Sequence, residues 1–344
     1  MTNDALRALL DWHSARHRGV TAQDEVRLVL QSWMGGGAPP EEEATVRAIR
    51  EEEAGLFPSV QEPLTEPLGP RFVRLNLRRA MAEGIRPEWI ARLMHQAPAG
   101  MTRAEVLTAL DALEPANWAQ VIRRMREEPD WFPEHSEAYR AANAPAYRIV
   151  GRSAQALLPI LGEAARQWDK TRLLIAIDGP CGSGKTTLAN RLSAVLNAPC
   201  VRMDHFFLPH ALKTPERLAQ PGGNADLDRL LGEFFTPWLS AGCASYRPYD
   251  CHRDCLGAPV DIPVSHVAIL EGSYSLHPAI ACYADIRVFL QIDPEEQRRR
   301  IVSRNGLAGW ARFADKWIPL EHAYFDAFHL PDARCLTLQP SQEV

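Results

Sequence analysis

The segment GPCGSGKTT holds the residues whose types and spacing indicate the most specific chemistry in this sequence. Gly179, Gly184, Lys185 and Thr186 match the pattern G-x-x-x-x-G-K-[ST], with a short apolar run before it and a helical pattern after it. Glycines let backbone N–H groups curl around phosphate oxygens, and the start of the following helix adds its positive dipole end. The segment therefore predicts a P-loop that binds the phosphates of a nucleotide.

Two side chains of this loop have separate expected roles. Lys185 would reach the β- and γ-phosphates, and Thr186 would ligate Mg²⁺, so ATP and Mg²⁺ are the expected cofactors. Cys181 is expected to fill space in the loop, with a redox role as the alternative. The expected nucleotide-binding residues are Gly179, Pro180, Cys181, Gly182, Ser183, Gly184, Lys185, Thr186 and Thr187.

A P-loop alone does not say how the nucleotide is used. The N-K-x-D sequence of guanine recognition and the LSGGQ signature of transporter ATPases are both absent from the chain. No downstream motif is typical of a helicase or an AAA+ motor. A kinase of small molecules is therefore the favoured class.

Two carboxylates outside the loop come directly after apolar runs. Glu271 ends VAILEG, and Asp204 follows VRM in VRMDHFFLP. Ligands of open α/β sheets gather at the carboxyl ends of the strands. Glu271 is therefore expected to help hold Mg²⁺, and Asp204 is expected to accept the proton of an acceptor hydroxyl, a contribution of roughly 10²–10⁴ in rate. An exposed acid at the end of a strand is the alternative in both cases.

A basic segment, PEEQRRRIVSRNG, follows later in the chain. Arg300 and Arg304 are four residues apart, so they share one face of the predicted helix. Guanidinium groups that clamp a transferring phosphoryl group contribute up to about 10³–10⁵ in rate. A solvated basic face is the alternative interpretation.

The elements that must position these residues alternate between strands and helices from residue 172 onward. Short apolar runs at 172–178, 199–203, 265–272, 284–292 and 334–338 are separated by helical stretches. This alternation indicates a parallel sheet covered by helices on both faces. A helix over 152–168 would lead into this domain.

The first 130 or so residues have an almost wholly helical pattern, with further amphipathic segments at 74–84, 87–95 and 102–113. The predicted organisation is a helical domain of unknown role over 1–150 and a P-loop domain over 151–344. The boundary segment contains two Tyr-Arg pairs, Tyr139-Arg140 and Tyr147-Arg148. They could contact a ligand or anchor a domain junction.

The composition narrows the range of partners. The formal net charge is -5, which argues against a dedicated nucleic-acid binder. No apolar run approaches the roughly 18 to 20 residues that span a bilayer, and the N-terminus lacks a signal-peptide core. Seven scattered cysteines fit reduced thiols. The expected protein is cytoplasmic and binds a small-molecule acceptor, with the oligomeric state, including a homo-oligomer, left open.

The ordered motifs GPCGSGKTT, MDHFFLP, GGNADLDRL, YRPYDCH, LEGSYSL and RRRIVSRNG resemble the uridine kinase branch of the P-loop kinases over about residues 170–340. That branch includes nicotinamide riboside kinase, pantothenate kinase and phosphoribulokinase. The resemblance implies a P-loop NTPase-type parallel sheet of about five strands, flanked by helices and carrying a lid near the arginines. It also implies transfer of a phosphoryl group from ATP to a hydroxyl.

The resemblance assigns roles residue by residue. The catalytic aspartate of the family falls on Asp204, and its lid arginines look like Arg300 and Arg304. The residues that the resemblance places at the acceptor are His205, Phe207, Asn224, Asp226, Tyr249, Asp250 and His252. His205 stands where the family has a second acid or a serine, and the segment around His252 is shorter than the pattern of the family.

Three functional readings follow. The first is a kinase of a nucleoside such as uridine. The second is a kinase of another acceptor, such as nicotinamide riboside, a pantothenate-like compound or a sugar. The third is a nucleotide-sensing regulatory module, in which the helical domain binds a partner.

Overall fold

The computed structural model describes residues 2–37, 39, 41–113 and 116–339 of the chain. The chain divides into two compact units, Met1–Gln155 and Ala156–Val344, which are called the N-terminal and C-terminal units below. None of the helices described is both long enough and apolar enough to cross a membrane.

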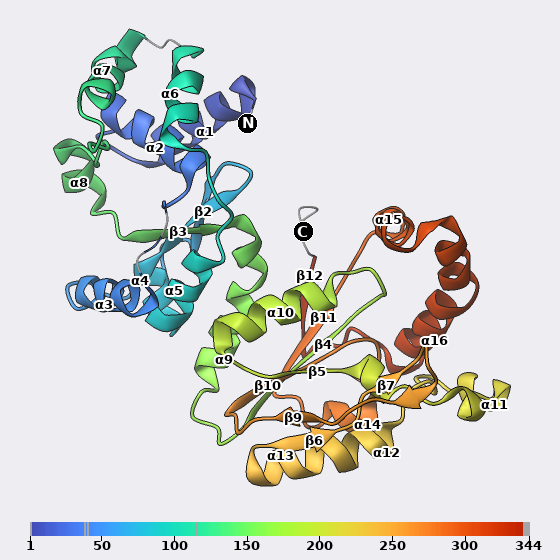
Figure 1. Cartoon of the computed structure of the whole chain (residues 1–344). Coiled ribbons are helices and arrows are strands. Elements are labelled where there is room, and N and C mark those ends of the chain that lie inside the picture. Colours follow the sequence, from blue (N-terminus) through green and yellow to red (C-terminus); the bar gives the residue numbers. More distant parts are fainter. Residues whose placement is uncertain (1, 38, 40, 114–115, 340–344) are drawn as a thin grey trace. The chain divides into compact units, whose positions relative to one another are not determined.

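The C-terminal unit is built on a five-stranded sheet with the order β12-β11-β4-β10-β5 (Figure 1). All four neighbouring pairs are parallel. The five strands are β4 (Leu173–Asp178), β5 (Cys200–Arg202), β10 (Val267–Glu271), β11 (Ile286–Leu290) and β12 (Cys335–Leu338). Each lies inside one of the apolar runs, so the predicted α/β P-loop fold with about five parallel strands is confirmed.

Strand β4 shows why these segments form central strands. All six of its residues are buried, as expected for a strand that is covered on both faces. Leu174 and Ala176 pack in one cluster with Phe234 and Trp238. Helix α10 (Lys185–Leu196) contacts β4 and β10, and Figure 1 shows it on the face opposite α13 (Thr236–Ala241).

The register of the sheet brings the ends of three strands to one edge. Glu271 of β10 lies opposite Ile177 of β4 and opposite Arg202 of β5. The carboxyl ends of β4, β5 and β10 are therefore aligned at one edge of the sheet. The P-loop follows β4 there, and a short helix, η3 (Met203–Phe206), follows β5.

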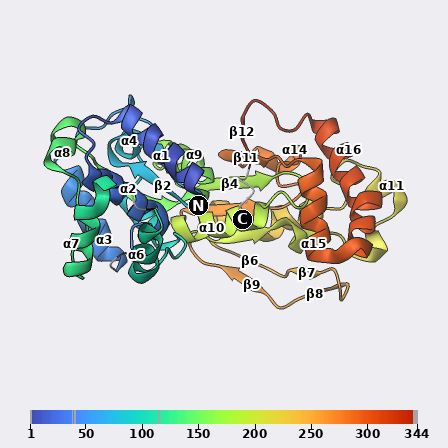
Figure 2. The ribbon, with the colours of Figure 1, turned by 90° about the horizontal axis from the view of Figure 1, so that it is seen from above.

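A pair of helices lies beyond this edge of the sheet (Figure 2). They are α15 (Pro294–Arg312) and α16 (Ile318–Phe328), joined through η6 (Phe313–Trp317). Inside α15 the backbone breaks at Gly306, whose φ of 70° and ψ of 176° are not helical. A positive φ of this kind is a conformation that glycine adopts at little cost.

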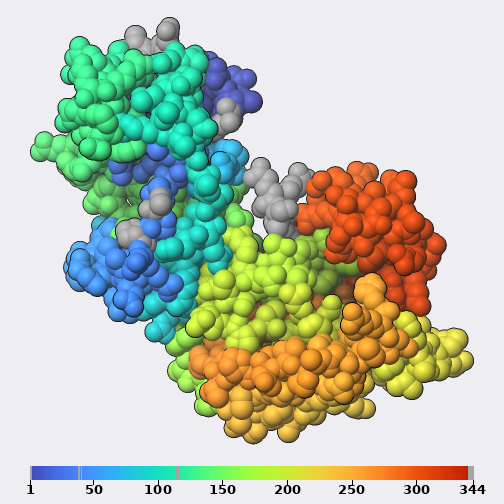
Figure 3. Space-filling model, viewed as in Figure 1, coloured from blue at the N-terminus to red at the C-terminus, as the bar shows by residue number. Residues whose placement is uncertain are grey.

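The remaining elements of the C-terminal unit are short. Two antiparallel two-stranded ribbons, β6 with β9 and β7 with β8, lie at the surface in the space-filling view (Figure 3). Their bounds are β6 (Ala244–Tyr246), β7 (Tyr249–Asp250), β8 (Cys255–Leu256) and β9 (Val260–Ile262). The other helices are α9 (Leu158–Arg166), η4 (His210–Leu212), α11 (Pro215–Leu218), α12 (Leu227–Arg229), η5 (Leu230–Phe235) and α14 (Pro278–Ala281).

The N-terminal unit is mainly helical, but it also contains a three-stranded antiparallel sheet in the order β1-β2-β3. The strands are β1 (Thr65–Leu68), β2 (Phe72–Asn76) and β3 (Tyr147–Gly151). The helices are α1 (Asn3–Arg16), α2 (Ala22–Met34), α3 (Glu42–Glu53), α4 (Leu77–Ala82), α5 (Pro87–His95), α6 (Arg103–Asp111), α7 (Ala119–Glu127) and α8 (Glu137–Asn143).

This sheet corrects the almost wholly helical pattern that the sequence predicts. The predicted amphipathic segment 74–84 divides into the end of β2 and helix α4. The strand is hard to recognise because it passes directly into a helix, with Asn76 as the helix cap. Its partner β3 lies about 70 residues later in the chain.

A polar network crosses the core of the N-terminal unit. Arg74, 2% exposed, donates to the side-chain oxygen of Gln31 and to Nε2 of His13. His135 lies between Asp24 and the Tyr147 hydroxyl, at 3.1 and 2.7 Å. Burial and the charge of Arg74 lower the pKa of His13 to about 3. Burial and the charge of Arg27 lower the pKa of His135 to about 4.

These histidines predict that the N-terminal unit loses stability in mild acid. In the unfolded chain both rings take up protons near pH 6.5, while in the folded unit they stay neutral. As the pH falls, the unfolded state therefore binds more protons than the folded state does. At about pH 5 each ring lowers the free energy of unfolding by about 2 kcal/mol relative to neutral pH. Thermal denaturation of His13→Gln, which keeps an acceptor for Arg74, should show a flatter pH dependence than the natural protein between about pH 7 and pH 5. The exposed His252→Gln is the control, and an equal slope in His13→Gln would contradict the assignment.

Candidate active site

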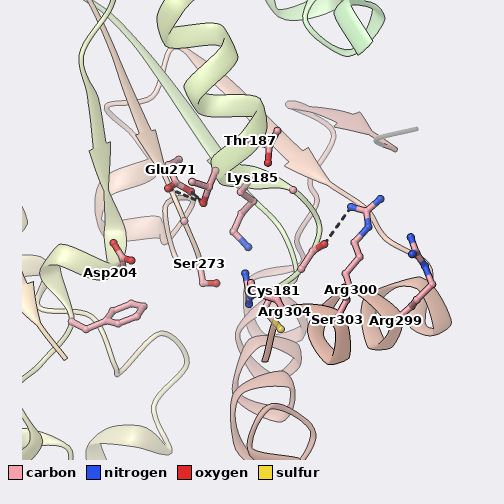
Figure 4. A pocket seen from close by; sticks show the side chains of 15 residues that line it. Cys181, Lys185, Thr187, Asp204, Glu271, Ser273, Arg299, Arg300, Ser303 and Arg304 are labelled. Carbon is pink, nitrogen blue, oxygen red and sulfur yellow. Dashed lines mark hydrogen bonds between the residues drawn. The ribbon is translucent and has the colours of Figure 1, made fainter. Parts of the chain in front are cut away.

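A cleft of about 510 Å³ opens at the carboxyl edge of the sheet (Figure 4). It is formed by the P-loop, the loops after β5 and β10, and helix α15. Its lining residues are Cys181, Gly182, Gly184, Lys185, Thr186, Thr187, Asp204, Phe207, Glu271, Gly272, Ser273, Arg299, Arg300, Ser303 and Arg304. The fold thus brings together residues that lie more than 120 positions apart in the sequence.

The P-loop connects β4 to α10 through a tight turn. Gly179 has a φ of 138°, and a Cβ at this position would collide with the carbonyl oxygen of Leu290 on β11. The side chain of Lys185 is buried, and its Nζ donates to the carbonyl oxygens of Gly179 at 2.5 Å and Pro180 at 3.0 Å. The ammonium group therefore lies over the loop, where it could exchange these carbonyl oxygens for phosphate oxygens.

Thr186 and Glu271 form a pair of oxygen ligands beside this lysine. The Thr186 hydroxyl donates to the two Glu271 carboxylate oxygens at 3.1 and 3.3 Å. Burial raises the pKa of Glu271, while the charge of Lys185 acts against that rise. A hydroxyl and a carboxylate are hard oxygen donors, and Mg²⁺ is commonly held by one or two protein oxygens together with water and phosphate. The pair therefore fits a nucleotide-bound Mg²⁺.

Asp204 stands at the open side of the cleft. It lies in η3, and its side chain is 65% exposed. The carboxylate makes no hydrogen bond with any residue that the structure describes, and Nε2 of His205 is 4.0 Å away. In Figure 4 Asp204 lies across an open space from Ser273 and Lys185. A hydroxyl held in this space would meet a carboxylate that is free to accept its proton.

The arginines of α15 line the opposite wall. Arg300 donates to Glu296 at 2.6 Å and to the carbonyl oxygen of Gly182 at 3.3 Å, so it is held against the P-loop. Arg304 donates to Asn305 and lies over the ring of Phe313. Both side chains line the cleft on which Lys185 also lies.

Glu296 fixes two of the arginines at the start of this wall. It accepts hydrogen bonds from Arg299 and Arg300. These bonds lower the pKa of Glu296 to about 2, so it stays ionised. Phosphate oxygens that arrive in the cleft would compete with this carboxylate for Arg300.

Phe207 is the one residue of the predicted acceptor set that lines this cleft. His205 is turned toward Tyr246, whose hydroxyl lies 3.0 Å from the histidine Nδ1. Burial lowers the pKa of His205, against the attraction of Asp204. Asn224 is buried, and its side-chain oxygen has no hydrogen-bond partner in the described structure.

The other predicted acceptor residues make local structural contacts. Asp226 caps helix α12 by accepting from the backbone N–H of Arg229. The Tyr249 hydroxyl donates to Asp254 at 2.6 Å. Asp250 accepts from the backbone N–H of His252, and the His252 side chain is exposed in the turn between β7 and β8. The structure does not place these residues on the cleft, so their binding roles stay predictions.

The structure adds a buried polar contact between α16 and the P-loop that sequence reasoning missed. Glu321 accepts from the backbone N–H of Cys181 at 2.8 Å and from the Ser273 hydroxyl at 2.6 Å. One turn later, Tyr324 donates to Asp178 at 2.8 Å. Asp178 and Ser273 follow or end predicted strands and could have been suspected from their position. Glu321 and Tyr324 lie some 140 residues beyond the loop, and no local pattern marks them.

Two groups in this contact have displaced pKa values. Burial raises the pKa of Asp178 to about 6, although Lys185 and hydrogen bonds from Leu276, Gly179 and Tyr324 act in the opposite direction. Burial, together with the nearby charge of Glu321, raises the pKa of the Cys181 thiol to about 12. The thiol is therefore protonated at neutral pH, which makes it a poor nucleophile.

Solved structures similar to this chain cover about half of it. A candidate fructose transport system kinase from Silicibacter sp. TM1040 shares 26% identity over 54% of this chain and 98% of its own, with a TM-score of 0.43. A possible uridine kinase from Bacillus stearothermophilus shares 20% identity over 48% of this chain and 89% of its own, with a TM-score of 0.38. The YGR205w protein shares 15% identity over 55% of this chain and 94% of its own, with a TM-score of 0.37. No protein-family model and no curated protein matches the chain.

Proposed function

We propose that the C-terminal unit transfers the γ-phosphoryl group of ATP to a hydroxyl of a small metabolite, most readily a nucleoside. The observation that carries the proposal is one cleft that holds a P-loop lysine, an oxygen pair for Mg²⁺, an aspartate with no hydrogen-bond partner among the described residues, and three arginines. Each part has a known role in phosphoryl transfer, in which catalysis rests on positioning and on stabilising negative charge.

The residues of the cleft would divide the work as follows. The backbone of the P-loop and Lys185 hold the phosphates, and Thr186 with Glu271 would hold the Mg²⁺ that neutralises developing charge on them. Asp204 orients the acceptor hydroxyl and takes its proton. Arg300 and Arg304 face the phosphates from α15 and balance the negative charge that builds up during transfer.

An aspartate in this place favours a kinase over a regulatory switch. Asp204 is exposed to the cleft and has no hydrogen-bonding partner among the described residues, which suits a group that must meet a substrate. A nucleotide switch needs phosphate contacts but has no use for an acceptor base. The aromatic ring of Phe207 beside Asp204 would stack on a flat group such as a nucleobase, which supports the nucleoside as acceptor.

The proposal is tested by measuring ADP release by the purified full chain with ATP and a panel of acceptors. The panel contains nucleosides, nicotinamide riboside, pantothenate and hexoses. We expect ATP turnover that depends on one acceptor class, with a nucleoside the best. ATP turnover with another acceptor class would show that the acceptor is not a nucleoside but would still support phosphoryl transfer. ATP turnover that is independent of every acceptor would contradict the proposal.

Removing the Thr186 hydroxyl should raise the need for Mg²⁺. Thr186→Val keeps the shape of the side chain but deletes one oxygen ligand. We expect the Mg²⁺ concentration for half-maximal activity to rise at least about tenfold, in line with the 10- to 100-fold effects of losing groups that support a metal. A titration of activity against Mg²⁺ measures this shift.

The matched control for this titration is Thr236→Val, an exposed threonine at the start of α13. Its Mg²⁺ curve should coincide with that of the natural protein. A Thr186→Val curve that also coincides would remove the threonine from the metal site.

A further inference from the structure

The N-terminal unit contains a second hollow, of about 180 Å³, lined mainly by polar side chains. Its walls come from the residue after α1, from the segment around β1, from β2 and α4, and from the chain that runs from α8 into β3. The two tyrosines of the Tyr-Arg pairs, Tyr139 and Tyr147, both line it. Their neighbours do not, because Arg140 pairs with Glu134 and Arg148 pairs with Glu52.

Two positive charges face this hollow. Arg74 is almost completely buried, and its hydrogen bonds go to the neutral acceptors Gln31 and His13. Its one carboxylate partner in the described structure is Glu66, at the long distance of 4.0 Å. Arg78 donates to the carbonyl oxygen of Ala144 and has no ion-pair partner among the described residues. Arg74 also lies over the ring of Tyr147, 4.6 Å from its centroid, so among the described residues its only carboxylate partner is distant, and an anion in the hollow would add to its compensation.

Two negative charges face the same hollow. Glu66 lies directly across from Arg74 in the β1–β2 register and also contacts His17 at 3.3 Å. Glu62 accepts from the side-chain amide of Asn76, and within the described ranges no cation lies within ion-pair distance of it. Burial opposes ionisation of Glu66, but contact with His17 and the charge of Arg74 bring its pKa below the ordinary value. Glu66 is therefore ionised at neutral pH.

The balance of these groups defines the ligand. A ligand with a single charge would contact either the two guanidinium groups or the two carboxylates favourably, but not both. A ligand with a carboxylate and an ammonium group a short distance apart matches both. The hollow has a volume of about 180 Å³, so the part of a ligand that it encloses must be small.

We propose that this hollow binds a small zwitterionic α-amino acid. Arg74 and Arg78 receive its carboxylate, and Glu62 and Glu66 receive its ammonium group. All the residues of this site belong to the N-terminal unit. The proposal does not depend on the proposed phosphoryl transfer, so an experiment can contradict one proposal and leave the other intact.

The test measures binding to the full chain by ligand-observed NMR, with the twenty common amino acids up to about 10 mM, the range of millimolar affinity. The amino acid that binds best is then compared with analogues that lack one charge. For L-alanine these are propionate, which lacks the ammonium group, and ethylamine, which lacks the carboxylate. We expect the zwitterion to bind at least about tenfold more tightly than either analogue, because each analogue leaves one pair of charges unmatched.

Two variants report on the two ends of the ligand. Arg78→Gln and Glu62→Gln change half-buried side chains on the wall of the hollow and avoid the buried Arg74. Each should weaken binding at least about tenfold while the thermal melting curve stays that of a folded protein. Arg140→Gln is the control, because this exposed arginine lies on α8 outside the hollow and its variant should bind normally.

Three results would overturn the proposal. The first is binding of propionate or ethylamine as tight as that of the matching amino acid. The second is unchanged binding in a folded Arg78→Gln or Glu62→Gln variant. The third is the absence of binding by all twenty amino acids.

Discussion

Replacing Asp204 by asparagine should lower kcat for phosphoryl transfer by about 10²–10⁴, the usual contribution of a general base. Asparagine keeps the size of the side chain and can still accept a hydrogen bond, but it cannot take up the proton of the acceptor hydroxyl. Asp204 makes no hydrogen bond with a described residue, and its ion pair with His205 is long, at 4.0 Å, so the substitution should cost little stability. The affinity for ATP should change little, since the proposed function assigns the phosphates to the P-loop and α15.

The measurement is steady-state kinetics with the best acceptor, together with a separate titration of ATP binding. Asp228→Asn is the matched control, because Asp228 is an exposed acid on α12 outside the cleft. Its kcat should be that of the natural protein. An Asp204→Asn variant with full acceptor-dependent activity would remove Asp204 from the chemistry, and a variant that loses ATP binding would point to a role in the nucleotide site instead.

The strands of the C-terminal unit could be predicted because burial on both faces leaves a clear trace in the sequence. A central parallel strand must be apolar at every position, as β4 is, and the turns and helices between such strands interrupt the runs. The same rule locates the cleft, since residues directly after these runs must meet at one edge. Asp204 and Glu271 were found in this way, without knowledge of any contact.

The strands of the N-terminal sheet are not marked by continuous apolar runs of this kind. Strand β2 is short, carries the buried Arg74 among its apolar residues, and runs into α4 without a turn. Its arginine is tolerated because Gln31, His13 and Glu66 surround it, and these residues come from α1, α2 and β1. Periodicity over a window of adjacent residues cannot reveal a polar side chain whose partners lie so far along the chain.

The same limit applies to the wall of the cleft that α16 supports. Glu321 and Tyr324 are one turn apart on a helix, and each reaches a group at the P-loop or next to it. Their neighbours in sequence give no reason to separate them from ordinary surface residues. Only the packing of α16 against the P-loop reveals that Glu321 binds the Cys181 N–H, while α15 contacts the same loop directly through Arg300.

Replacing Arg300 by methionine should lower kcat by about 10³ or more, the scale on which an arginine acts on a transferring phosphoryl group. Arg300 is held between Glu296 and the carbonyl oxygen of Gly182, so its guanidinium group already stands at the P-loop. Arg300→Lys keeps the charge but loses the planar pair of donors. Its kcat should therefore lie between that of the natural protein and that of Arg300→Met. Arg304→Met should act in the same direction, because Arg304 lines the same wall.

The control for these arginines is present on the same helix. Arg298 is exposed and does not line the cleft, so Arg298→Met removes an equal charge from α15 without touching the site. If the arginines acted only through the general positive field of this helix, Arg298→Met and Arg300→Met would lower kcat alike. A loss confined to Arg300 and Arg304 would show that the position of the guanidinium group at the phosphates, and not the charge of the helix, carries the effect.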